Sequence, residues 1–92
     1  MTKIGCIYEN TQTKELLILI NFTRGDYTFC DEAGNYSDVP KTANYKQVTS
    51  KSKVNGFLCA LRNSGHYQTV RDSIKRSADS GDGTMKYLEY IN

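Results

Sequence analysis

The sequence predicts an α+β domain, in which a small antiparallel sheet of five short strands is followed by two short helices and a C-terminal strand. Three observations predict this fold class. Short apolar segments separated by turn residues fill residues 1–49, apolar residues at helical spacing follow in residues 50–78, and a turn with an alternating segment occupies residues 79–92. At 92 residues, the chain has the length of a single domain with one core.

The acidic, strand-rich region of residues 1–49 has its strongest signal in the middle. Residues 15–22, ELLILINF, combine Leu and Ile without alternation, which indicates a central strand covered on both faces. Periodicity alone also fits a buried helix, but the turn residues on either side favour a strand. In the number and spacing of its strands, this region resembles an SH3-like partial barrel. The five expected strands cover residues 3–8, 15–22, 26–30, 35–39 and 44–49.

Apolar residues at positions i, i+3, i+4 and i+7 predict the first helix. Ser50 or Ser52 can cap its start, and Gly65 can end it. The helix is therefore expected within residues 50–65. The residues that would form its buried face are Val54, Phe57, Leu58 and Leu61.

A second helix is predicted for residues 66–78. Its apolar stripe is narrower than that of the first helix, which predicts shallower burial. Residues 79–83, DSGDG, are expected to end this helix, and the alternation in residues 84–91 predicts a last strand. The stripe consists of Tyr67, Val70 and Ile74.

The three cysteines, Cys6, Cys30 and Cys59, lie far apart in the sequence and form no CxxC pair. We expect them to be reduced and mostly buried, with no disulfide and no metal site. The longest apolar run, residues 16–20, is too short to cross a bilayer, and no signal-peptide pattern precedes it. Together with the initial Met1, these features predict a cytoplasmic protein that does not contact membranes.

The net charge of +2 conceals an uneven distribution along the chain. Residues 1–40 contain three basic and six acidic groups, a net charge of −3. Residues 41–76 contain eight basic groups against Asp72 alone, a net charge of +7, and residues 77–92 carry −2. A surface that gathers these cations would attract polyanions, with an affinity that falls as salt rises because counterions are released.

The basic middle region contains the candidate binding residues. On the second helix, Arg71 and Lys75 lie at i and i+4 and share a face. Asp72 has the same spacing from Arg76 and can partly neutralise it. Cations of this kind bind phosphates and rings stack on bases, although an ordinary solvated face has the same composition. The candidates are Lys51, Lys53, Arg62, His66, Arg71, Lys75 and Arg76, with Tyr45 and Tyr67 as stacking or interface rings.

Catalytic and cofactor chemistry find little support in this sequence. His66 is the only histidine, and the scattered cysteines are expected within apolar segments, so no Cys/His pair is predicted. Asp31 and Glu32 fall in a turn with Gly34, where they favour the turn rather than share a proton. We therefore expect a binding protein without enzymatic activity and without a cofactor.

A small chain with short strands, two short helices, no catalytic motif and a bipolar charge pattern resembles the small proteins that phages encode to block host machinery, including anti-CRISPR proteins. The resemblance concerns the whole chain and rests on no motif. It implies an inhibitor or regulator in the host cytoplasm that engages nucleic acid, RNA or DNA, or a nucleoprotein complex such as a CRISPR effector. The alternative is a protein–protein inhibitor or adaptor that binds a host protein, without nucleic acid, through a Tyr-rich acidic surface containing Asp26, Asp31, Glu32 and Asp38.

Overall fold

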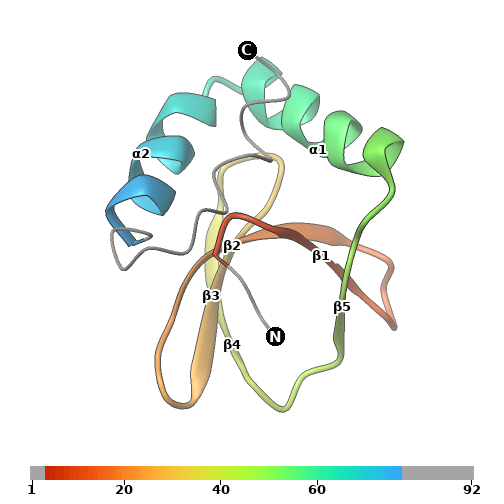
Figure 1. Ribbon diagram of the computed structural model, residues 1–92, viewed down its shortest axis with the longest axis vertical. Helices are drawn as coiled ribbons and strands as arrows, with labels where there is room; N and C mark the ends of the chain where they lie inside the picture. Colours follow the sequence, from red (N-terminus) through yellow and green to blue (C-terminus); the bar gives the residue numbers. More distant parts are fainter. Residues whose placement is uncertain (1–3, 78–92) are drawn as a thin grey trace.

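The computed structural model describes residues 4–77, which form one antiparallel sheet and two helices (Figure 1). The predicted α+β class is therefore confirmed, and the strand predicted for residues 84–91 lies outside the described residues. The strands are β1 (Ile7–Asn10), β2 (Leu16–Phe22), β3 (Asp26–Cys30), β4 (Tyr36–Pro40) and β5 (Tyr45–Gln47), and the helices are α1 (Lys51–Asn63) and α2 (Tyr67–Ser77).

The sheet is curled, as its strand order requires. Neighbouring strands are antiparallel in the order β4-β3-β2-β1-β5, so β4 and β5 form the two edges although they are consecutive in the chain. In a flat sheet these edges would lie about 19 Å apart. The connection from Pro40 to Tyr45 spans at most about 18 Å when fully extended, and it contains a turn closed by the Ala43 amide and the Pro40 carbonyl. The edges must therefore approach each other, which gives the expected partial barrel.

Phe29 on β3 fills the inside of this curl. Its ring centre lies 4.7 Å from that of Tyr45 on β5, although β3 and β5 would be about 14 Å apart in a flat sheet. The rings of Tyr8 and Tyr27 lie 5.9 and 5.8 Å from Phe29. The Phe29 side chain is completely buried, so the curled sheet has an aromatic core of its own.

The helices cover the other face of the sheet. One residue from each of β1, β2, β3 and β4 shares that face, because their positions pair directly across the strands: Ile7, Ile18, Cys30 and Tyr36. α2 packs against β2, and the Tyr36 hydroxyl lies 3.2 Å from Ser73 Oγ in α2. Figure 1 shows both helices on the same side of the sheet, joined by the short connection at residues 64–66.

β2 is the central strand that the sequence predicts. Residues 17–20 are at most 4% exposed, which requires cover on both faces because successive side chains point to opposite sides. The aromatic core covers one face and the helices cover the other. The alternative interpretation of this segment as a buried helix is therefore wrong.

Both helices bury the apolar faces that their spacing predicts. The expectation of shallow burial for α2 is wrong, because Val70 and Ile74 are fully buried. α2 packs against both β2 and α1, so even a narrow stripe is enclosed from two directions. The helical face thereby adds a second apolar layer to the domain.

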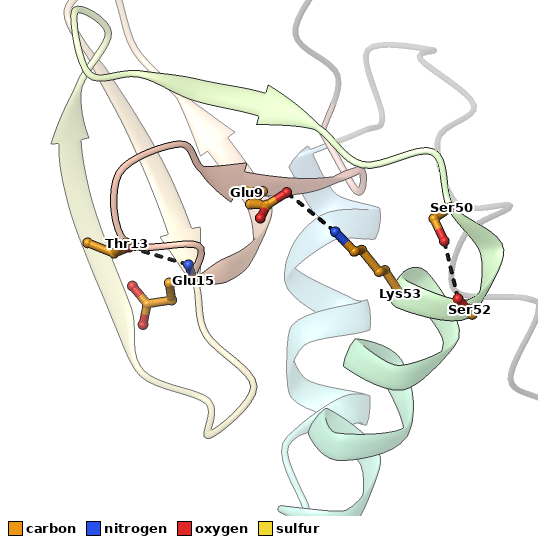
Figure 2. Close-up of polar contacts among 6 residues, drawn as sticks. All are labelled: Glu9, Thr13, Glu15, Ser50, Ser52 and Lys53. Carbon is orange, nitrogen blue, oxygen red and sulfur yellow. Dashed lines mark hydrogen bonds and ion pairs between the residues drawn. The ribbon is translucent and has the colours of Figure 1, made fainter.

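The ends of α1 follow the prediction in part. Ser50 occupies the N-cap position, but its hydroxyl makes no cap hydrogen bond and lies 3.2 Å from Ser52 Oγ instead (Figure 2). At the other end, Gly65 adopts φ +83° and its amide donates to the Arg62 carbonyl. Glycine adopts this left-handed conformation without strain, and the chain can therefore turn directly into α2.

β1 differs most from its predicted boundaries. It begins at Ile7 rather than at residue 3, because Gly5 adopts φ +88° and interrupts the extended chain. It continues to Asn10, whose Oδ1 accepts hydrogen bonds from the Gln12 and Thr13 amides at 2.9 and 3.1 Å. This side-chain turn fixes where β1 ends and the chain reverses.

Candidate nucleic-acid interface

α2 places three cations around its exposed side. Arg71 is half-buried, whereas Lys75 and Arg76 are exposed. Arg71 and Lys75 are one turn apart and share a flank, and Arg76 projects about 100° further around the helix. No carboxylate of residues 4–77 forms a salt bridge with any of these three side chains. They are therefore available to an anion on another molecule.

The acidic residue of α2 does not neutralise these cations as predicted. Asp72 Oδ1 accepts a hydrogen bond from Gln68 Nε2 at 3.0 Å. Arg76 Nη2 donates instead to Ser73 Oγ at 3.4 Å. The expected pairing of Asp72 with Arg76 is therefore wrong, because each side chain finds a different partner on the helix.

Arg62 is a further cation, located in the last turn of α1 just before the connection to α2. Its Cζ lies 5.8 Å from the centre of the Tyr67 ring. Burial raises the pKa of Tyr67, and the charges of Arg71 and Arg62 partly offset that rise. The last turn of α1 and the first turns of α2 thus bring Arg62 and Arg71 near one buried phenol. We call Arg62, Arg71, Lys75 and Arg76 the basic helical surface.

Arg71 contains a buried donor without an acceptor. Its Nε is shielded from solvent and finds no hydrogen-bond partner within the described part of the chain, although buried polar groups are nearly always paired. Helical side chains lean toward the N-terminus of their helix, so Arg71 leans toward the start of α2. The N-terminal end of a helix favours anions.

His66 is partly committed to the fold. Gly34, in the turn between β3 and β4, adopts φ +86°, and a Cβ at this position would overlap the His66 ring. The connection between the helices therefore packs on the β3–β4 turn. One side of the imidazole is covered by Gly34, and the residue is otherwise exposed.

The two predicted lysines of α1 lie away from the basic helical surface. Eleven residues separate Lys51 from Arg62, which is about 16 Å along the helix axis. Figure 2 shows Lys53 reaching from the first turn of α1 toward β1, where its Nζ lies 3.7 Å from Glu9 Oε1. The seven predicted cationic positions therefore divide into one group around α2 and a separate pair at the start of α1.

Neither predicted stacking ring is open to a base, although Arg62 lies beside the Tyr67 ring. Tyr67 is only 8% exposed, and Tyr45 is half-buried against Phe29 on the other face of the sheet. Of the rings in residues 4–77, the structure exposes Tyr36, at 46%, and Phe22, at 42%, and Tyr36 contacts α2. Sequence reasoning does not single out Tyr36, because its contact in α2, Ser73, lies 37 residues further along the chain.

The three thiols lie in different parts of the fold. Cys6 and Cys30 are buried as expected, whereas Cys59 is exposed on α1, and none of the three forms a disulfide. Burial and the neighbouring Asp31 carboxylate raise the pKa of Cys30 to about 12. Within residues 4–77, no three His, Cys, Asp or Glu side chains are grouped so that they could hold a metal ion. No helix in this part of the chain is long and apolar enough to span a bilayer.

Comparisons with known proteins assign no family to this geometry. No protein-family model, curated protein or solved structure significantly matches the chain. The function must therefore be argued from the charges, rings and hydrogen bonds described above.

Proposed function

We propose that this chain is a non-catalytic binding domain that contacts the phosphate backbone of nucleic acid through the basic helical surface. The observation that carries the proposal is the gathering of Arg71, Lys75 and Arg76 on α2 without a carboxylate partner in residues 4–77. Nucleic acids present closely spaced phosphates, which arginine and lysine bind through charge-assisted hydrogen bonds.

The distribution of charge between the two layers supports this orientation. Residues 51–77, which form the helices, contain six basic groups and one acidic group. Residues 4–50, which form the sheet, contain four basic and six acidic groups. Phosphates are attracted to the first layer and repelled by the second, so the helices would face the nucleic acid.

The pair of guanidinium groups near Tyr67 is the strongest part of the surface. An arginine presents several donors in a rigid fork that fits phosphate oxygens. Arg62 and Arg71 come from two helices whose relative position is fixed by the buried Tyr67 and by Gly65 in the connection. A phosphate bound between them would meet guanidinium donors that are already in place.

Two carboxylates of the acidic surface accept hydrogen bonds within the fold. Asp31 Oδ1 accepts hydrogen bonds from the Ala33 and Asn35 amides at 3.0 and 2.9 Å. Asp38 accepts one from Thr28 Oγ1 at 2.7 Å. Because both carboxylates already stabilise the sheet, the geometry favours the basic helical surface over the acidic one.

The narrower role is that of a regulator or inhibitor of a nucleoprotein complex. What supports it is the resemblance in size, composition and charge pattern to small phage inhibitors such as anti-CRISPR proteins. A surface that binds phosphates could occupy the nucleic acid of such a complex, or replace contacts that the complex makes with its own nucleic acid. We propose that this complex is a CRISPR effector.

Charge reversal tests the proposed surface. The variant Arg71→Glu/Lys75→Glu should bind labelled RNA or DNA more than about tenfold more weakly than the wild type at low salt, because two attractive contacts become repulsive. Fluorescence anisotropy with a short labelled oligonucleotide measures the affinity. Both side chains lie outside the apolar core, so the thermal unfolding curve should change little.

A matched control carries the same change in net charge on the sheet layer. Lys14→Glu/Arg24→Glu alters two exposed residues in turns of the sheet layer, and its affinity should stay close to that of the wild type. Equal losses in both double variants would indicate only a nonspecific effect of net charge. An absence of binding at low salt by the wild-type protein would contradict the proposal outright.

A further inference from the structure

The exposed Tyr36 ring borders the basic helical surface. Tyr36 begins β4, which is an edge strand of the sheet, and its side chain is 46% exposed. Its position pairs with Cys30, so the ring lies on the sheet face that α2 covers. The hydroxyl lies 3.2 Å from Ser73 Oγ in α2. The ring is therefore held at one end, and about half of the side chain remains open to solvent.

The same serine also holds a cation. Arg76 Nη2 donates to Ser73 Oγ at 3.4 Å, so one hydroxyl group contacts both the Tyr36 phenol and the Arg76 guanidinium. Arg76 is exposed and has no carboxylate partner within residues 4–77. An aromatic face and an unneutralised cation are thus fixed next to each other where α2 meets the edge of the sheet.

This pairing fits one part of a nucleic acid in particular. A tyrosine ring stacks on the flat face of a base, and an adjacent arginine binds the phosphate of the same or the next nucleotide. In a duplex the base faces are covered by neighbouring base pairs, whereas in a single strand they are open to stacking. A fixed ring also loses little conformational freedom on binding.

We infer that Tyr36, Ser73 and Arg76 form a stacking site for an unpaired base and its phosphate, so that the domain selects single-stranded over double-stranded nucleic acid. This inference rests on the proposed function and names the form of nucleic acid that the same surface takes. Arg62, Arg71 and Lys75 then follow the phosphate backbone on the other flank of α2.

The other exposed aromatic residue has a different environment. Phe22 is 42% exposed, close to the value for Tyr36, but Lys41 Nζ lies 4.9 Å from its ring centre and 5.6 Å from that of Tyr27. Phe22 pairs with Tyr27, which is three residues from Cys30, so it lies on the sheet face opposite to Tyr36. Phe22→Leu is therefore a matched control: it removes an equally exposed ring that is remote from α2.

The test compares a fluorescein-labelled oligo(U) or oligo(dT) strand with the same strand annealed to its complement. The wild type should bind the single strand more tightly than the duplex. Tyr36→Leu should weaken single-strand binding by roughly five- to one-hundredfold, the range measured when a stacking ring is removed, and should leave duplex binding unchanged. Tyr36→Phe keeps the ring but loses the hydroxyl that contacts Ser73, so its single-strand affinity should fall several-fold and lie between those of the wild type and Tyr36→Leu, whereas Phe22→Leu should match the wild type.

Ser73→Ala provides a second variant if Tyr36→Leu lowers the stability of the fold. It keeps both the ring and the guanidinium but removes the hydroxyl that holds them, so single-strand affinity should fall several-fold with duplex affinity unchanged. Equal wild-type affinity for single strand and duplex would overturn the inference, as would equal losses on both in Tyr36→Leu. If Arg71→Glu/Lys75→Glu still abolished binding in that case, the proposed function would stand without the stacking site. No binding of any oligonucleotide by the wild type would overturn both.

Discussion

The sheet and the helices of this domain differ in the side chains that they bury and in the charges that they expose to solvent. The sheet turns its rings inward, where Tyr8, Tyr27 and Tyr45 surround the buried Phe29, and two of its carboxylates are engaged in hydrogen bonds of the fold. The helices turn their apolar stripes onto the sheet and carry six cations against one carboxylate. The comparison teaches that the aromatic core belongs to the sheet, whereas Arg71, Lys75 and Arg76, which have no carboxylate partner in residues 4–77, belong to the helices.

This division can be tested by changing one layer at a time. Substitutions inside the curled sheet should lower the free energy of unfolding and leave the affinity of the folded protein unchanged. Substitutions on the basic helical surface should do the reverse. The contact between Gly34 and His66 joins the two layers, so a change there tests how strongly they are coupled.

Removing the ring at the centre of the curl should have the largest effect. Phe29→Ala deletes a fully buried side chain that contacts rings from three strands, and it should cost about 3–5 kcal/mol of unfolding free energy. Urea denaturation followed by circular dichroism measures the change. A cost below about 1 kcal/mol would show that the sheet does not close around Phe29.

Phe22→Ala is the control for that experiment. Its ring is 42% exposed, so the loss should stay below about 1 kcal/mol. If Phe22→Ala lowered the unfolding free energy more than Phe29→Ala does, the aromatic core would not be centred on Phe29 as described.

A methyl group at the junction of the two layers should have the next largest effect. Gly34→Ala combines an unfavourable φ of +86° with an overlap between the new Cβ and the His66 ring. The substitution should cost about 1–3 kcal/mol, measured by thermal or urea unfolding.

His66→Ala separates the two causes. In the double variant Gly34→Ala/His66→Ala the overlap is relieved but the backbone strain remains, so part of the lost stability should return. If the double variant were no more stable than Gly34→Ala, the helical connection would not pack on this turn as described.

A third effect appears only at alkaline pH. The Cys30 thiol is buried and donates to the Asp31 carbonyl, and its pKa rises from 9.0 to about 12. Because the folded-state pKa exceeds the unfolded one, the associated stability is complete below pH 9 and is lost as the pH rises toward 12. The free energy of unfolding should therefore fall by up to about 1.4 kcal/mol per pH unit in that interval.

Cys30→Ala should lack this contribution. Parallel pH series of the wild type and the variant cancel the titration of the other groups, and the difference in slope between pH 9 and pH 12 reports the thiol. Identical slopes would mean that Cys30 ionises in the folded protein as readily as in the unfolded chain.

Much of the fold could be predicted from the sequence because its signals are local. The uninterrupted apolar run of β2, the four-residue apolar face of α1 and the position of Gly65 each follow from one short segment. The start of β1 could not be predicted, because apolar residues 3–8 suit a strand and only the φ of Gly5 interrupts it. The depth at which α2 is buried depends on two other elements and leaves no local signal.

The cations of the candidate site could be predicted from the sequence, but which of the aromatic rings are exposed could not. Positive residues are conspicuous in any sequence, and Arg71 and Lys75 share a flank simply by helical spacing. Which tyrosines are exposed depends on the curl of the sheet, which turns Tyr45 inward, and on the docking of α2, which covers Tyr67 and leaves Tyr36 open. Asp72 was expected to partly neutralise Arg76. Instead, Asp72 accepts a hydrogen bond from Gln68 and Arg76 donates one to Ser73, because these residues are similarly close along the same helix.

The salt dependence of binding tests the central claim most directly. If the basic helical surface contacts phosphates, the logarithm of the binding constant for a labelled single strand should fall linearly with the logarithm of salt concentration, by about 0.7 per phosphate contact. Arg71→Ala should lower that slope by about the same amount, whereas Arg24→Ala, on the sheet layer, should leave it unchanged. Binding that does not depend on salt, or equal slopes for the wild type and Arg71→Ala, would contradict the account.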